Sequence, residues 1–170
     1  MKSMYKFYFT AVLTFLFTLS LNTSLSADDS LKPDLIDIPG WQGEPAQAMT
    51  MEMNGINMIT ATRSYEKADN SFDAAILITT QQMGMMSFQQ MSMSEGGISI
   101  NSTQMDGFKV VHSHDANENS GNFMVLLGET TSNSALFSMS YEGLSDKESL
   151  AIAKIYDWKA MQAAAEKLMK

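Results

Sequence analysis

Residues 49–60 read MTMEMNGINMIT, and this stretch carries the clearest fold signal in the sequence. Asn54 and Gly55 separate two runs in which side chains alternate, which is typical of a β-hairpin with a type I′ turn. A two-residue loop sets the register of the whole hairpin, because side chains repeat every second residue along a strand. The pairs expected to face each other are Met53–Ile56, Met51–Met58 and Met49–Thr60.

The rest of the chain extends this hairpin into a larger sheet. Alternating or continuously apolar runs predict about seven strands, at residues 49–53, 56–60, 72–79, 98–104, 108–114, 122–128 and 135–141. Ser145 and Glu148 form a capping-box pattern, and Asp157 is a second candidate helix cap, so the end of the chain is predicted to be helical. We therefore expect a single α+β domain, a mostly antiparallel sheet with C-terminal helices packed on it.

The segment at residues 81–93 fits two interpretations. Its straight-chain residues favour a helix, with Met83, Met86 and Met93 on one stripe, but Gly84 weakens that assignment. A middle helix packed on the sheet and a mobile lid are both compatible with this pattern.

The N-terminus has the features of a secretory signal peptide. A short basic start is followed by an apolar run at residues 7–21 and by small residues up to Ala27. We expect cleavage after Ala27, with Ser26 as the alternative, and then no membrane insertion of the mature chain. Residues 28–45 hold all three prolines and are expected to form an extended leader before the globular domain, residues 46–170. The predicted location is the bacterial periplasm, with secretion as the alternative.

Composition excludes several classes of function. The chain has no cysteine, so it has no disulfide framework, thiolate zinc site or iron–sulfur cluster. It carries 11 Lys+Arg against 19 Asp+Glu, a net charge of −8, which disfavours binding to nucleic acid. No nucleophile elbow, phosphate-binding loop, dinucleotide fingerprint or metalloprotease helix is present. These absences favour a protein that acts by binding and is not an enzyme, with no resident cofactor. A hydrolase that combines His112 or His114 with one of the many serines is the enzymatic alternative, although no local sequence marks such a serine.

Methionine is the unusual component, with 16 residues in a chain of 170. Because a thioether is a soft ligand, clustered methionines can bind Cu(I) or Ag(I). In composition and compartment the chain resembles the Met-rich proteins that handle copper in the bacterial periplasm. The simpler interpretation is that a methionine stripe fills the core, and a third is a deformable groove for an apolar ligand or a peptide. The candidate soft-metal ligands are Met49, Met51, Met53, Met58, His112 and His114.

The two histidines alternate on one predicted strand face with Phe108 and Val110. A metal site with two histidines would need Asp115 or Glu118 to fold back as the carboxylate ligand. The simpler expectation is a strand end that runs into a polar loop, with both imidazoles partly exposed.

Arg63 is the single arginine and lies within a predicted strand. Its fork could hold a carboxylate or phosphate, but pairing with a nearby acid such as Glu52 is the simpler expectation. Together these features predict an exported, non-enzymatic binding or accessory protein for a small apolar ligand or a protein partner. The alternative is a periplasmic Cu(I) or Ag(I) binder or metallochaperone.

Overall fold

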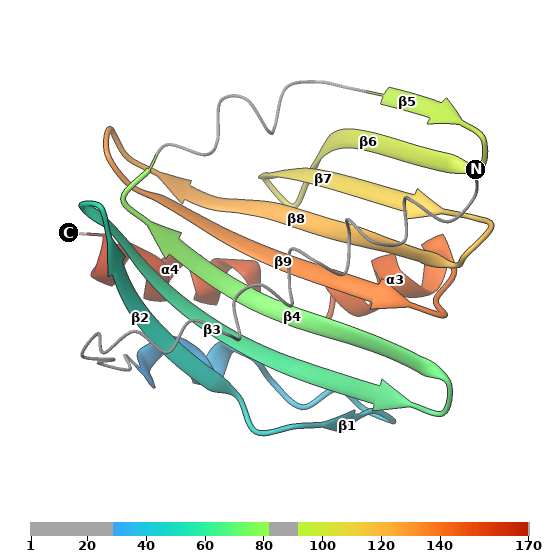
Figure 1. Ribbon diagram of the computed structural model, residues 1–170, viewed down its shortest axis with the longest axis horizontal. Coiled ribbons are helices and arrows are strands. Elements are labelled where there is room, and N and C mark those ends of the chain that lie inside the picture. The colour runs from blue at the N-terminus through green and yellow to red at the C-terminus, as the bar shows by residue number, and fades with distance from the viewer. Residues whose placement is uncertain (1–28, 82–91, 170) are drawn as a thin grey trace.

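The computed structural model describes residues 29–81 and 92–169. Its central feature is one antiparallel sheet of nine strands in the order β1-β3-β4-β9-β8-β7-β6-β5, with β2 also paired to β3 (Figure 1). The strands are β1 (Gln42–Gly43), β2 (Gln47–Met53), β3 (Ile56–Lys67), β4 (Asn70–Thr79), β5 (Ser92–Glu95), β6 (Ile98–Met105), β7 (Phe108–Asp115), β8 (Ser120–Glu129) and β9 (Ser134–Glu142). The α+β class and the single domain are confirmed.

The strand count is higher than the predicted seven, because two short strands lie at the edges of the sheet. β1 has two residues and β5 has four, too few for an alternating pattern to be read from the sequence. Met93, expected on the apolar stripe of a candidate helix, lies in β5, because this part of the segment is a short strand; Met83 and Met86 fall outside the described residues.

The first hairpin has the predicted register. Met53 pairs with Ile56, and Met51 pairs with Met58. Asn54 and Gly55 both have positive φ, at 54° and 78°, as a type I′ turn requires.

The helices all pack on the same face of the sheet, as Figure 1 shows. They are the 3-10 helix η2 (Asp29–Asp34), α3 (Asp146–Ala153) and α4 (Trp158–Leu168). The predicted capping box at the start of α3 is present, and Asp157 caps α4 by accepting from the backbone N–H groups of Lys159 and Ala160. No helix of the described residues has the length and apolar character needed to cross a membrane.

The core lies between this helix layer and the sheet. Its largest fully buried side chains include Tyr65, Phe72, Phe123 and Phe137, one from each of four adjacent strands, β3, β4, β9 and β8. Burying these aromatic side chains supplies much of the apolar area that stabilises the fold.

The segment expected to be an extended leader is part of this core. Leu31, Leu35 and Ile38 are buried, and Trp41 packs edge-on against Phe72 with ring centroids 4.7 Å apart. The apolar residues of this segment are spaced by a short 3-10 helix and a turn, so they show no regular periodicity in sequence although they cover one end of the sheet.

Candidate functional site

The four candidate methionines of the first hairpin lie together on the face of the sheet opposite the helices. Met51 and Met58 are direct cross-strand neighbours, and Met49 and Met53 lie two residues to either side of Met51 on the same face. Met53 is 65% exposed, and the other three are half-buried. These thioethers are therefore outside the helix-covered core, where we had expected a methionine stripe to pack.

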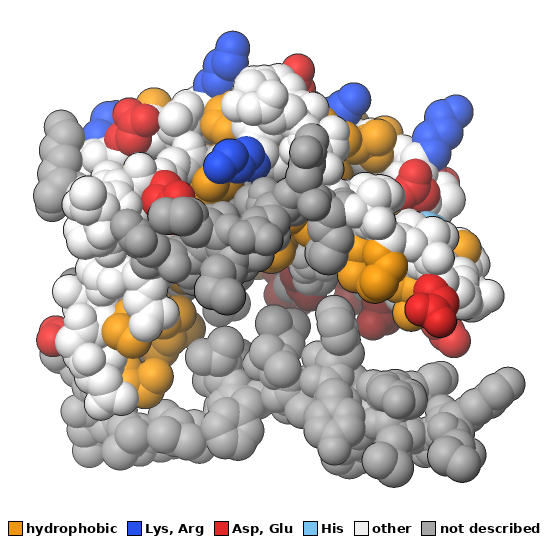
Figure 2. Space-filling view, turned by 90° about the horizontal axis from the view of Figure 1, so that it is seen from above, with side chains coloured by type: hydrophobic (Ala, Val, Ile, Leu, Met, Phe, Trp, Pro, Cys, Tyr) orange, Lys and Arg blue, Asp and Glu red, His pale blue; other side chains and the backbone are white. Residues whose placement is uncertain are grey.

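Further apolar side chains lie across the sheet from these methionines and form a band with them, which Thr60 interrupts between Met49 and Leu77. Strand pairing places Leu77 beside Leu136, and Leu136 beside Leu126. All three lie on the face of the sheet opposite the helices, which we call the open face. Val111 and Leu136 are buried there in a second, smaller cluster, against which Ile100, Met124 and Leu126 pack. In Figure 2, groups of hydrophobic side chains lie along the lower side of the described surface, whereas most of the Lys and Arg side chains in view project from the opposite side.

The same open face becomes polar and acidic toward the other ends of its strands. Ser64, Asp73, Ser140, Asn122 and Ser113 are successive cross-strand neighbours on this face. Beyond them, a row that runs from β3 to β5 carries the carboxylates of Glu66, Glu142, Asp115 and Glu95. The open face therefore has an apolar half and an acidic half.

The two histidines lie on the other face, under α3. Both residues are only 8% exposed, and their imidazoles contact the hydroxyl of Tyr141, at 2.9 Å from His112 Nε2 and 3.0 Å from His114 Nδ1. The expectation of partly exposed rings at a strand end is wrong, because α3 covers this end of β7. The sheet thus separates the candidate ligands, and the methionines and histidines cannot share one metal ion.

Gly121 makes the shared Tyr141 contact possible. It pairs with His114 on one side and with Tyr141 on the other, so the tyrosine ring must cross it. A Cβ at Gly121 would lie 2.5 Å from the Tyr141 hydroxyl. A glycine within a strand often marks such a close approach, and this was the one local signal for the cluster in the sequence.

Each hydrogen bond of this cluster is donated in the direction of Asp146, whose carboxylate lies at the protein surface. Asp146 Oδ1 lies 3.4 Å from His112 Nδ1, which favours a proton on that nitrogen. His112 Nε2 then accepts from the Tyr141 hydroxyl, whose oxygen in turn accepts from His114 Nδ1. Burial lowers the pKa of His112, although Asp146 opposes this, and burial raises the pKa of Tyr141. Both groups are therefore held in their neutral forms.

Ser149, His112 and Asp146 have the order of contacts found in a serine–histidine–acid triad, but the geometry does not suit a nucleophile. Ser149 Oγ is 3.5 Å from His112 Nε2 and donates instead to the backbone carbonyl of Asp146 at 2.9 Å. The side chain is fully buried. These contacts hold α3 against β7. No local sequence pattern predicted that Tyr141, Asp146 or Ser149 would belong to this cluster.

Neither carboxylate proposed for a histidine metal site takes that role. Asp115 follows His114 directly and therefore points to the open face, and its carboxylate accepts from the backbone N–H of Asn117. Among residues 29–81 and 92–169, no group of three or more His, Cys, Asp or Glu side chains could hold a metal ion.

Arg63 is engaged inside the fold. Its Nε donates to the carbonyl of Glu44 at 2.7 Å, its Nη1 to the carbonyl of Leu35 at 2.8 Å, and its Nη2 pairs with Asp37. The acid is Asp37 and not Glu52. The arginine therefore fastens the N-terminal segment to β3, and its fork is occupied.

Comparison with known proteins adds no assignment: no family model, no curated protein and no solved structure matches this chain.

Proposed function

We propose that this protein is an exported, non-enzymatic binding or accessory protein that takes an apolar ligand or partner on the open face of its sheet. The observation that carries the proposal is the apolar band on the face opposite the helices, which has the hairpin methionines at one end and the cluster of Val111 and Leu136 at the other and is interrupted by Thr60. Five strand spacings separate β2 from β7, so the band is about 24 Å long. An elongated apolar group such as an acyl chain would match that length.

The flexibility of methionine supports this interpretation. Met49, Met51 and Met58 are half-buried, and unbranched thioether side chains repack easily around different apolar shapes. The fully buried Ser149, held by its own helix, supports a role in binding over one in catalysis.

A fluorescent apolar probe tests this proposal on the fragment 28–170. Changing both Met51 and Met58 to Gln places polar groups at the centre of the hairpin patch, and we expect about tenfold weaker binding of the probe. The matched control is Glu52→Gln on the same strand, since this exposed side chain lies on the other face. Equal affinity of the three proteins would contradict the proposal.

Export is tested separately. Mass spectrometry of the protein recovered from the periplasm of a bacterial host should give a chain that begins at Asp28, or at Ala27 if cleavage follows Ser26. An uncleaved chain that stays in the cytoplasm would contradict this part of the proposal.

The juxtaposed thioethers favour a second candidate function, the binding of Cu(I) or Ag(I). Met51 and Met58 face each other, and Met49 and Met53 flank them on the same face, so that four soft ligands are available on one hairpin. His112 and His114 are no longer expected to contribute to this site, because they lie on the opposite face.

A competitive Cu(I) titration under anaerobic conditions tests this candidate. We expect stoichiometric binding by the wild type and its loss when Met49, Met51 and Met53 are all changed to Leu, which roughly conserves volume. If the folded wild type binds no Cu(I), the soft-metal candidate is excluded and the apolar ligand is left as the proposed function.

A further inference from the structure

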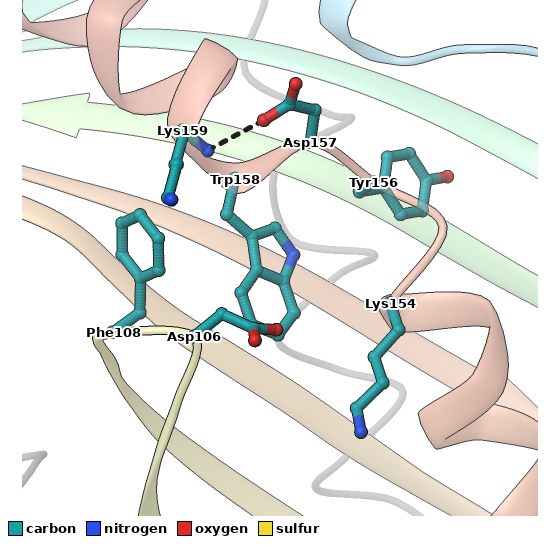
Figure 3. A pocket seen from close by; sticks show the side chains of 7 residues that line it. All are labelled: Asp106, Phe108, Lys154, Tyr156, Asp157, Trp158 and Lys159. Carbon is teal, nitrogen blue, oxygen red and sulfur yellow. Dashed lines mark hydrogen bonds between the residues drawn. The ribbon is translucent and has the colours of Figure 1, made fainter.

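Two features of the described residues are not explained by ligand binding on the open face. One is a hollow of about 230 Å³ between the β6–β7 turn and the connection from α3 to α4, lined by Phe108 and Trp158 among others (Figure 3). The Asp157 carboxylate beside it already caps α4, through the bond to the Lys159 backbone N–H drawn in that figure. The other feature is the outer edge of β2, which is suited to pairing with a further strand.

β2 lies at the border of the sheet, because it pairs with β3 on one side and with no described strand on the other (Figure 1). The two-residue type I′ turn makes Met53 and Ile56 a hydrogen-bonded pair, so every second residue of β2 bonds to β3. The alternate residue Glu52 therefore directs its backbone groups away from β3. The contacts of its partner Asn57 agree, since the backbone N–H and C=O of Asn57 both bond to Thr80 on the β4 side.

The outer edge of β2 thus presents the backbone N–H and C=O groups of Ala48, Thr50 and Glu52. Within residues 29–81 and 92–169, no hydrogen bond joins these groups to another element. β2 also lacks the features that usually protect an edge strand, because its sequence QAMTMEM has no lysine or proline and its register with β3 is regular. Glu52 is its single charged residue. Such an edge favours pairing with another strand.

We propose that β2 pairs with β2 of a second copy of this chain, antiparallel and about a twofold axis at Thr50. In an antiparallel pair the outward-directed residues form the hydrogen-bonded pairs, and Thr50 is the central one of the three. This register uses all 7 residues of β2 and gives about six backbone hydrogen bonds, within the range of about 5–15 in a typical protein interface. The two sheets then become one continuous sheet across an isologous interface.

The side chains of β2 complement themselves in this register. Glu52 lies opposite Ala48 of the second copy, so the two carboxylates do not face each other, and like charges opposite each other would destabilise the pair. On the open face, Met49 lies opposite Met51 of the second copy, which brings flexible thioether side chains into contact. Thr50 faces its own counterpart, a favourable cross-strand pair. These matches favour a second copy over an unrelated strand as the partner.

Pairing of the two edges also joins the two open faces. The hairpin methionines of both copies meet at the twofold axis, so their apolar bands become continuous across the dimer. The pairing itself depends on backbone groups at the edge and not on the open face. It therefore stands independently of the ligand proposed for that face.

The oligomeric state of the chain 28–170 tests the proposal. We expect sedimentation analysis at micromolar to millimolar concentrations to show a monomer–dimer equilibrium. Thr50→Pro removes an outward N–H that β3 does not use, a position where an edge strand tolerates proline. It should raise the dimer Kd about tenfold or more, because the twofold axis doubles each lost hydrogen bond. A wild type that is monomeric at millimolar concentration, or a folded Thr50→Pro variant that dimerises equally well, would overturn the proposal.

Introduced cysteines test the register, since the chain has none of its own. In Met49→Cys/Met51→Cys, each cysteine faces one of the second copy in a non-hydrogen-bonded pair with Cα atoms about 4.5 Å apart, close enough for a disulfide. The matched control Met49→Cys/Met53→Cys places no cysteine opposite another. We expect mild oxidation to give a covalent dimer of the first variant only. Equal cross-linking of both variants, or none of the first, would overturn the proposal. A thermal melt of each variant checks its folding.

Discussion

At His112, burial lowers the pKa of the imidazole, whereas the nearby charge of Asp146 raises it. Its imidazole is covered by α3 and faces the titratable groups of Asp146, His114 and Tyr141 together with the Ser149 hydroxyl. The neutral ring fits its hydrogen bonds, since Nε2 accepts from Tyr141. A proton on Nε2 would remove that acceptor and place a charge in the core.

Acidification should therefore destabilise the protein through His112. Because burial puts the folded pKa below the ordinary value of 6.5, the unfolded chain binds the proton first as pH falls. This contribution to stability is complete above pH 6.5 and is lost progressively as the pH drops toward the folded pKa. Thermal melts between neutral and mildly acidic pH should show a steeper loss of Tm for the wild type than for His112→Gln. Parallel curves for the two proteins would contradict this role.

Arg63 illustrates how a single side chain can connect distant parts of the chain. Its planar fork donates to two backbone carbonyls and to Asp37, a combination that an ammonium group cannot reproduce. We expect Arg63→Lys to lower the free energy of unfolding by about 1–3 kcal/mol, as measured by urea denaturation. A loss below about 0.5 kcal/mol would show that the fork is dispensable.

At the scale of elements, α3 depends on its N-terminal cap. Ser145 Oγ accepts from the backbone N–H of Glu148, and the Glu148 carboxylate accepts from the backbone N–H of Ser145 at 3.0 Å. The Ser145 hydroxyl also donates to this carboxylate, and that bond together with the one from the Ser145 backbone N–H lowers the pKa of Glu148. The helix has only eight residues, so it has few internal hydrogen bonds to compensate for a lost cap.

We expect Ser145→Ala to cost about 1 kcal/mol of stability in urea denaturation. The same change at the exposed Ser132 serves as a control and should have little effect. Since α3 covers the histidines, Ser145→Ala should also speed hydrogen exchange of the backbone amides of β7. Unchanged stability would mean that packing on β7 alone holds the helix.

At the scale of the whole molecule, the N-terminal segment is a structural part of the domain. Leu31, Leu35 and Ile38 are each buried by 97% or more, and Arg63 and Tyr65 bind backbone carbonyls of the same segment. Burial of three such side chains contributes about 5 kcal/mol or more, which is comparable with the total stability of a small domain.

A chain that starts at residue 46 should consequently fail to fold, whereas one that starts at residue 28 should fold normally. Circular dichroism and a cooperative thermal melt distinguish the two outcomes. A cooperative melt of the shorter chain at the Tm of the longer one would contradict the assignment of residues 29–45 to the core.

The hairpin register, the α+β class and both helix caps were predictable from the order of residues. These features depend on a few neighbouring residues: Asn54 and Gly55 fix the turn, Ser145 with Glu148 caps one helix, and Asp157 caps the other. Local backbone preferences and hydrogen bonds of this kind act within one turn or one pair of strands, so they can be read directly from the order of residues.

Which face of each element is covered could not be predicted in this way and follows from the packing of the helices on the sheet. Methionines and histidines both alternate on strands, but the helices pack on the face that holds His112 and leave Met51 on the other. The contacts of Tyr141 with the two histidines, and of Arg63 with residues 35–44, join positions about twenty or more residues apart. Such contacts follow from how the layers pack, and burial on one side of a sheet is a property of the assembled fold and not of any local pattern.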